Sequence, residues 1–227
     1  MSSAPVRSGC SRKMGCAHIH ARPDPRPTLE APDDDAYLWL GAPREVAIDW
    51  SELDNPDREL VERALEASVR AYAPYSLFAV GAAIRSRSGS VYTGANLENA
   101  SSGLTICAEA AALTAANAAG DFAVEAIAIV GFSFADTAGA SRVVVPCGSC
   151  RQLISEVASL TQSDVRILCC SGELSSIVEA TISQLLPSPF GPDNLGLPHQ
   201  WPRLQEKLQA RVKELIDLGL RKGQVPR

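Results

Sequence analysis

The sequence predicts an α/β fold, specifically a three-layer α/β/α domain with a mixed central sheet. Apolar segments typical of buried strands alternate with segments of helical periodicity. Four such strand segments are expected, over residues 78–84, 91–95, 124–132 and 165–170. A short turn containing Gly89 joins the first two, which predicts an antiparallel hairpin. Later strands are joined through helices and are therefore expected to be parallel.

Three helices are expected to cover this sheet. The first begins at Asn55-Pro56, interpreted as an N-cap followed by proline in the first turn, and stops before Pro74. Its predicted buried face carries residues of helical spacing, namely Leu60, Ala64, Leu65 and Val69. The alanine-rich segment 107–118 is the second helix, ended by Gly120, and 147–158 is the third.

Two extensions flank the predicted catalytic domain, which spans residues 46–197. Residues 1–45 are rich in Pro, Arg, Asp and Ser, which is typical of a disordered segment. Residues 198–227 are expected to form an amphipathic helical extension. Its apolar stripe, which would be buried on the domain or on another subunit, consists of Leu204, Leu208, Val212 and Leu215.

The composition excludes some classes of protein. The net charge of −5 argues against a nucleic-acid binder, which usually presents a basic face. No segment approaches the ~20 apolar residues that span a bilayer. The seven cysteines do not resemble a disulfide framework, so a reducing, cytoplasmic location is expected. The first acidic residue is Asp24, after several basic ones, which faintly resembles an organelle transit peptide; a disordered tail is the favoured interpretation.

Three cysteines have the spacing of metal ligands. Cys147 and Cys150 form a Cys-x-x-Cys at a predicted helix start, where backbone N–H dipoles favour thiolate over thiol. Cys107 also opens a predicted helix. Three protein ligands leave the fourth position of a tetrahedral zinc ion open for water, as in catalytic sites. No histidine lies between residues 21 and 198, so the predicted domain offers none as a fourth ligand.

Glu109, two residues after Cys107, is suited to proton transfer at that open position. A ligand-x-Glu followed by Pro-Cys-x-x-Cys is typical of zinc deaminases. A lone Cys-x-x-Cys is as often a redox pair or structural zinc, and a lone Cys-Ala-Glu means little. Together and in this order they predict one zinc-dependent hydrolytic site.

The chain resembles the cytidine deaminase family over roughly residues 56–196. The resemblance rests on five segments in the family's order: Tyr72–Gly81 (YAPYSLFAVG), Gly94–Ala100 (GANLENA), Thr105–Glu109 (TICAE), Pro146–Gln152 (PCGSCRQ) and Leu185–Pro192 (LLPSPFGP). It implies deamination of cytidine and 2′-deoxycytidine to uridine and 2′-deoxyuridine in pyrimidine salvage, with zinc-activated hydroxide and a Glu proton shuttle. A homotetramer with shared active sites is also implied.

The resemblance assigns roles to individual residues. Cys107, Cys147 and Cys150 would bind one zinc ion per subunit, and Glu109 would shuttle protons. The implied substrate-binding residues are Phe78 against the pyrimidine, Asn96 and Glu98 at the ribose, the Ala108 N–H at the base carbonyl, and Phe190 from a neighbouring subunit. Asn96 and Glu98 also alternate on one predicted strand end and so point to the same side. Without the family match, a turn-stabilising pair is the less favoured alternative for these two, and Phe78 alone would more often belong to the core.

Two positions depart from the family pattern. Ala110 stands where many members have an Arg that offsets the thiolate charge, and Ser102 stands where an aromatic residue is common. Helix dipoles and Arg151 would compensate the charge, with a surface or structural salt bridge as the alternative role of Arg151. These departures motivate an alternative substrate, a modified cytosine nucleoside or nucleoside antibiotic. A catalytically silent zinc-binding paralogue is a further alternative, and nucleic-acid editing is disfavoured by the acidic balance.

Overall fold

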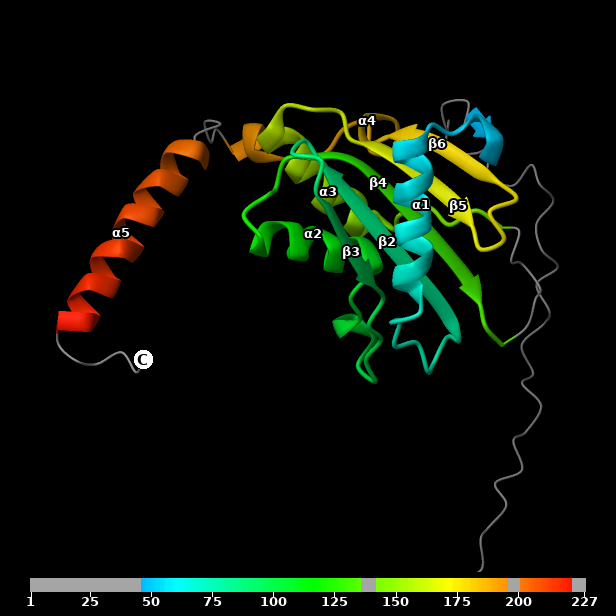
Figure 1. Ribbon diagram of the computed structural model, residues 1–227, viewed down its shortest axis with the longest axis horizontal. Coiled ribbons are helices and arrows are strands. Elements are labelled where there is room, and N and C mark those ends of the chain that lie inside the picture. Colours follow the sequence, from blue (N-terminus) through cyan, green and yellow to red (C-terminus); the bar gives the residue numbers. More distant parts are fainter. Residues whose placement is uncertain (1–45, 136–141, 196–200, 222–227) are drawn as a thin grey trace, which may run out of the picture. The chain divides into compact units, whose positions relative to one another are not determined.

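A six-stranded mixed sheet forms the centre of the domain (Figure 1). The structure is a computed structural model that describes residues 46–135, 142–195 and 201–221. The sheet order is β1-β6-β5-β4-β2-β3. The strands are β1 Val46–Ile48, β2 Phe78–Ser86, β3 Val91–Ala95, β4 Val124–Ser133, β5 Arg166–Ser171 and β6 Ile177–Thr181. The N-terminal extension predicted over 1–45 lies outside the described residues.

The strand directions confirm the predicted mixed α/β sheet. β3 and β4 both pair antiparallel with β2, and β4 pairs parallel with β5. β4 and β5 are connected through helix α3, as expected for a parallel pair. The short strands β1, at the edge of the sheet, and β6, next to it, were not predicted; β6 runs antiparallel to both β5 and β1.

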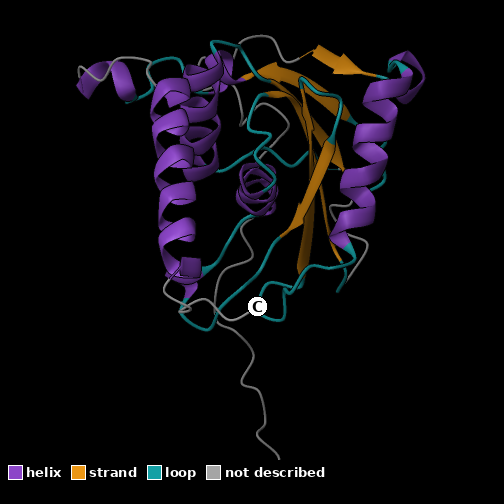
Figure 2. Cartoon of the chain, turned by 60° about the vertical axis from the view of Figure 1, so that its left-hand side comes forward, coloured by secondary structure: helices purple, strands orange, loops and turns teal. Residues whose placement is uncertain are grey.

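Helices cover both faces of the sheet, which gives the expected three layers (Figure 2). Helix α1, Asn55–Ser68, packs Leu60, Val61 and Ala64 on one face. Helices α2, Ala108–Ala118, and α3, Gly148–Thr161, cover the other face. The apolar strand β4 alternates between the two cores, because both of its faces are buried. Short helical turns complete this part of the chain: η2 Trp50–Glu52, η3 Ser102–Leu104, α4 Ile182–Leu185 and η4 Pro192–Leu195.

Two details of α1 correct the sequence-based expectation. The N-cap is Asp54, whose side chain accepts from the Asp57 N–H at 2.8 Å, and Asn55 is already helical. A carboxylate one residue earlier competes for the same role and takes it. The helix also ends at Ser68, so Val69 is its C-cap and is exposed instead of lying on the buried face.

The C-terminal helix forms as predicted, over α5 Trp201–Arg221. The expected burial of its stripe is not seen, because Leu204, Leu208, Val212 and Leu215 are all exposed. In the described ranges, no helix is both long enough and apolar enough to cross a membrane.

A buried ionic network fixes α1 to the sheet. The carboxylate of Asp57, in the first turn of α1, receives Arg85 of β2 at 3.0 Å and Arg166 of β5 at 2.7 Å. Arg166 also pairs with Glu179 of β6. The Asp57 side chain is 5% exposed, so water has little access to its carboxylate and cannot easily take the place of its arginine partners. One carboxylate therefore ties together three elements that are distant in the sequence.

Replacing Asp57 with Ala should leave two guanidinium groups without their shared partner. Removing one member of a buried pair costs about 3 kcal/mol of unfolding free energy, measurable by urea denaturation. Glu66→Ala, which removes the exposed Arg63–Glu66 pair, is the control and should change stability by less than about 0.5 kcal/mol. Equal losses in the two variants would contradict the importance of the Asp57 network.

Candidate active site

Three cysteine side chains meet where α2 and α3 begin. The sulfur atoms of Cys107, Cys147 and Cys150 all lie within 4.8 Å of one another. The Cys107 and Cys147 Sγ atoms are 3.7 Å apart. Tetrahedral zinc with Zn–S bonds of about 2.3 Å places neighbouring sulfurs about 3.8 Å apart. The donor set therefore fits a zinc ion in both chemistry and spacing.

Helix starts explain how the three sulfurs converge. Cys107 is the N-cap of α2, and Cys147 is the N-cap of α3. Cys150 lies three residues later, on the same side of the first turn of α3. The Cys107 side chain makes no capping hydrogen bond, and the Cys147 sulfur contacts first-turn backbone N–H groups of α3, which do not prevent metal binding. Both sulfurs therefore stay available as ligands beside the positive ends of two helix dipoles.

Gly94 lets α2 approach β3 closely enough to place Cys107. A Cβ atom at position 94 would overlap the Ala108 carbonyl oxygen and lie 2.5 Å from the Ala112 N. The equivalent close contact on the opposite face is at Gly81, where a Cβ would overlap the Ala64 carbonyl oxygen of α1. Two glycines thus set the spacing of the two helical layers, and Gly94 sets that of the cysteine-bearing one.

Glu109 is buried next to the cysteines, at 4% exposure. Burial raises the pKa of its carboxyl group, and the hydrogen bond with Cys150 opposes this only in part. The negative charge of Glu109 in turn raises the pKa of the Cys107 and Cys150 thiols. A buried carboxyl group whose pKa is raised, next to a metal-binding group of cysteines, is suited to proton transfer.

The three thiols have different acidities because their surroundings differ. Burial and the Glu109 charge raise the pKa of Cys107 to about 11, and the same two causes raise the pKa of Cys150. Burial also acts to raise the pKa of Cys147, but hydrogen bonds from the Cys150 backbone and the neighbouring thiols outweigh it, so this pKa is lowered. Bringing all three thiolates together requires a cation, which the site is built to hold.

Phe78 lies at the start of β2, half-buried over Gly131 of β4. A Cβ at position 131 would lie 3.0 Å from the Phe78 ring and 2.9 Å from Val144. Val144 belongs to the segment that leads into Cys147. The absence of a side chain at Gly131 therefore gives the Phe78 ring its place near the metal-binding segment.

Asn96 and Glu98 both contact the backbone around Phe78. The Asn96 side chain accepts from the Val80 N–H at 2.9 Å and donates to the Phe78 carbonyl at 3.0 Å. Glu98 accepts from the N–H groups of Tyr75 and Ser76. The structure thus brings Phe78, Asn96 and Glu98 together.

The other predicted residues take different positions. Ala108 is buried in the first turn of α2, where backbone N–H groups lack helical acceptors. Phe190 is exposed, and its carbonyl accepts from Gln152 of α3 at 2.5 Å. Arg151 donates to the Pro146 and Leu185 carbonyls at 2.9 and 3.2 Å. Arg151 therefore braces the backbone before Cys147, which is the structural alternative considered for it.

The two positions that depart from the family pattern lie on the surface side of the site. Ser102 is exposed in the turn η3. Ala110 lines a groove of about 300 Å³ between α2 and α3. Neither position supplies a charge or a ring to the cysteines.

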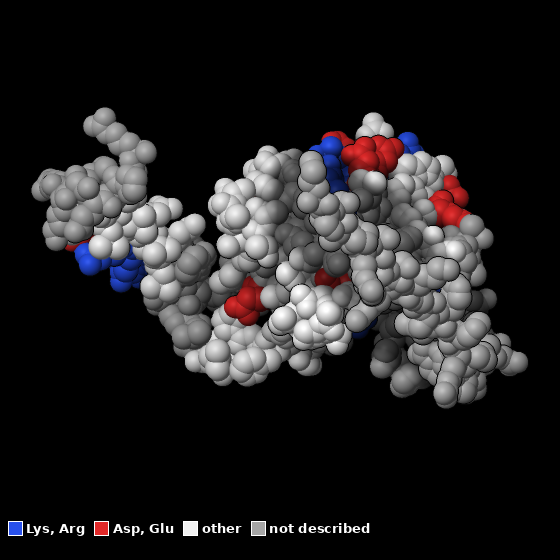
Figure 3. Space-filling model, turned by 90° about the horizontal axis from the view of Figure 1, so that it is seen from below, with Lys and Arg blue, Asp and Glu red and all other residues white. Residues whose placement is uncertain are grey.

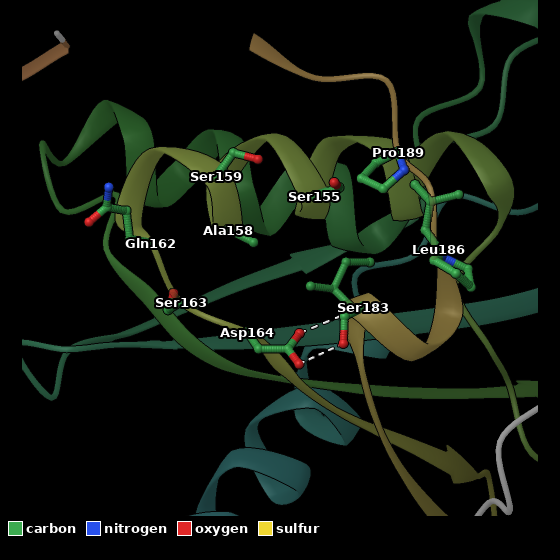
Figure 4. A pocket seen from close by; sticks show the side chains of 11 residues that line it. Ser155, Ala158, Ser159, Gln162, Ser163, Asp164, Ser183, Leu186 and Pro189 are labelled. Atoms are coloured by element: carbon green, nitrogen blue, oxygen red, sulfur yellow. Dashed lines mark hydrogen bonds between the residues drawn. The ribbon is translucent and has the colours of Figure 1, made fainter. Parts of the chain in front are cut away.

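A separate hollow of about 430 Å³ lies at the far end of α3 from the cysteines (Figure 4). Its lining includes Ser155, Ser159 and Asp164, and the Asp164 carboxylate accepts from the Ser183 N–H and hydroxyl. None of the three cysteines lines it. On the face drawn in Figure 3, the charged side chains of the described residues form small, separate groups.

Sequence reasoning missed some residues that shape the site. Gly94 opens the family segment Gly94–Ala100, but its contact with α2 depends on packing between distant elements. Leu77 adopts a left-handed backbone conformation, with φ of 55°, immediately before Phe78. Nothing in a leucine signals that conformation, so only the fold reveals it.

Known proteins resemble this chain in the region that contains these residues. Residues 54–162 match the family model "Cytidine and deoxycytidylate deaminase zinc-binding region". A cytidine deaminase of Halalkalibacterium halodurans is 45% identical over 142 residues, covering 62% of this chain and 98% of that protein. One from Mycobacterium tuberculosis is 36% identical, covering 65% and 94% respectively.

A solved structure shares the fold as well as the sequence. The crystal structure of cytidine deaminase from Burkholderia pseudomallei matches with a TM-score of 0.52 and 37% identity. The match covers 61% of this chain and all of that one. With its cysteine geometry and nearly full coverage of such relatives, the chain belongs to the cytidine deaminase family.

Proposed function

We propose that this chain hydrolyses cytidine and 2′-deoxycytidine to uridine and 2′-deoxyuridine, with release of ammonia. One observation carries the proposal: three sulfur atoms converge within 4.8 Å beside a buried carboxyl group. The relatives named cytidine deaminase support the choice of substrate.

Cys107, Cys147 and Cys150 would hold zinc through their sulfur atoms. Three protein ligands leave one tetrahedral position for water. When bound, zinc lowers the pKa of that water to about 7, which supplies a nucleophile at neutral pH. Cys147 and Cys107 lie at helix N-termini, whose dipoles favour the thiolate form that ligation requires, although burial and the Glu109 charge outweigh this at Cys107 until a cation binds.

Glu109 would carry the protons of the reaction. It takes a proton from the attacking water and passes it to N3 of the cytosine ring, which makes C4 more electrophilic. It then takes the remaining proton from the hydroxyl on C4, as the C4 carbonyl forms, and passes it to the amino group, which leaves as ammonia. Burial raises the pKa of this carboxyl group, so it can hold the transferred proton.

The substrate would be held by residues around the start of β2. Phe78 packs against the pyrimidine ring, and the Ala108 N–H receives the base carbonyl. Asn96 and Glu98 bind the ribose hydroxyls, since an amide and a carboxylate can both accept hydroxyl protons. Both side chains bond the backbone on either side of Phe78, which supports a sugar contact next to the ring contact.

Phe190 would complete a neighbouring copy's site within a homotetramer. The ring is 62% exposed, while its backbone is held by Gln152. An exposed aromatic side chain on a fixed backbone is suited to inserting into a partner. With this substrate the chain would act in pyrimidine salvage, and we place it in the cytoplasm on the ground of its cysteine usage.

A modified cytosine nucleoside is the second candidate substrate. Ser102 is exposed and small where an aromatic side chain is common, which leaves more room on that side of the site. A kinetic panel of cytidine, 2′-deoxycytidine, cytosine, CMP and a cytosine nucleoside antibiotic distinguishes the candidates. The highest kcat/KM for the antibiotic would replace the first proposal with the second.

Glu109→Gln should retain one zinc ion per chain and lose turnover, because the amide cannot transfer the proton. Loss of a general acid–base lowers kcat about 100-fold to 10,000-fold. Zinc content and ultraviolet-monitored cytidine turnover are measured on the same sample. Glu173→Gln changes an exposed turn residue and should remain fully active. Full activity of Glu109→Gln would exclude the proton-transfer role.

Gly94→Ala should lower zinc occupancy, because the added methyl group displaces the α2 backbone that carries Cys107 and Glu109. Gly81→Ala is the matched control, since its methyl group displaces α1 on the opposite face. Both should lower stability. Below the unfolding transition, Gly81→Ala should keep zinc while Gly94→Ala binds it at least about tenfold more weakly. Equal zinc affinity in the two variants would contradict the role of Gly94.

A further inference from the structure

The turn Ala73–Phe78, which we call the Phe78 turn, holds an unfavourable backbone conformation. Leu77 has a φ of 55°, in the left-handed region that side chains other than Gly, Asn and Asp rarely adopt. Its N–H donates to the Ala73 carbonyl at 3.1 Å. Leu77 is 39% exposed, so its side chain is not buried deeply enough to compensate for this strain. Something outside the turn must hold this conformation.

Glu98 supplies hydrogen bonds that close the Phe78 turn. Its Oε2 accepts from the Tyr75 N–H at 2.9 Å and from the Ser76 N–H at 3.3 Å. Its own backbone N–H donates to the Tyr72 carbonyl at 2.8 Å. The carboxylate therefore bonds the middle of the turn, while its backbone fixes the segment just before the turn.

Asn96 fixes the other end of the turn. Its amide bonds the Phe78 carbonyl and the Val80 N–H, at 3.0 and 2.9 Å. Leu77 thus lies between two clamped segments, and the Phe78 ring follows it directly. Because Phe78 packs over Gly131, a small rotation of this turn would move the ring.

We infer that Glu98 is a positioning residue, which holds the strained Phe78 turn and thereby fixes the Phe78 ring. This rests on the proposed function only in that the ring is taken to contact the pyrimidine. The role is additional to the sugar contact proposed above. The backbone bonds of Glu98 form in the protein itself, so they act before any nucleoside binds.

The carboxylate can serve the turn and the sugar together. Both backbone bonds end on Oε2, so the turn's backbone does not use Oε1. Hydrogen bonds from the Ser76 side chain and the Tyr75 backbone lower the pKa of Glu98, which keeps it charged at neutral pH. Sugar recognition and ring placement therefore meet at one side chain.

Amide hydrogen exchange of the substrate-free protein tests the clamp directly. In Glu98→Ala, the N–H groups of Tyr75 and Ser76 lose their acceptor and should exchange about fivefold faster. Glu98→Gln keeps an acceptor oxygen and should stay close to the wild-type rate. Asp164→Ala is the matched control, because Asp164 is also an exposed carboxylate that bonds a backbone N–H, at the far end of α3 (Figure 4). It should leave the Phe78 turn unchanged.

A rescue experiment separates positioning from sugar binding. Glu98→Ala should lower kcat/KM for cytidine. Adding Leu77→Asn to that variant should raise its kcat/KM about fivefold, since Asn tolerates the left-handed region better than Leu. Leu77→Asn alone should change little, because the clamp is then intact. A lost sugar contact would not respond to residue 77.

Unchanged exchange in Glu98→Ala, or no gain from Leu77→Asn in that background, would overturn the positioning role. A wild-type protein that does not deaminate cytidine would instead refute the proposed function, and the exchange measurement would still decide whether Glu98 holds the turn.

Discussion

The convergence of two helix N-termini on three sulfur atoms is the constraint on which the rest of the site depends. Cys107 and Cys147 occupy the same position, the N-cap, in α2 and α3. Their sulfurs approach to 3.7 Å only if the helices begin side by side against the sheet. Gly94 permits this on the α2 side, and Arg151 braces the α3 side through the Pro146 carbonyl. A shift of either helix would separate ligands that lie far apart in the sequence.

Helix α2 places the Glu109 carboxyl group and the Ala108 N–H as well as Cys107. Glu109 lies two residues after Cys107, so any movement of α2 carries the sulfur and the carboxyl group together. The Ala108 N–H lies between them and is one of the first-turn donors without a helical acceptor. The proposed metal ligand, base-binding N–H and proton carrier would thus come from three consecutive residues, which makes their relative geometry a property of one helix start.

The sequence predicted the parts that depend on local pattern. Cys-x-x-Cys spacing, the hairpin around Gly89 and the apolar strand β4 are each readable from a few neighbouring residues. The short strands β1 and β6 were missed because such short segments become strands only through pairing with distant ones. The strain at Leu77 and the contact at Gly94 likewise arise from packing between elements. The N-cap was misplaced by one residue because Asp54 and Asn55 have similar cap preferences.

The helix N-termini also explain how Ala110 can stand in place of an arginine. Three thiolates around a divalent cation leave one net negative charge. Each helix N-terminus contributes the equivalent of about half a positive charge, so two of them supply about one. Hydrogen bonds from the Cys150 and Ser149 backbone already lower the pKa of Cys147 in this way, against the effect of burial. The backbone of α2 and α3 can therefore balance the site without a charged side chain at position 110, which leaves Arg151 free for its structural bonds.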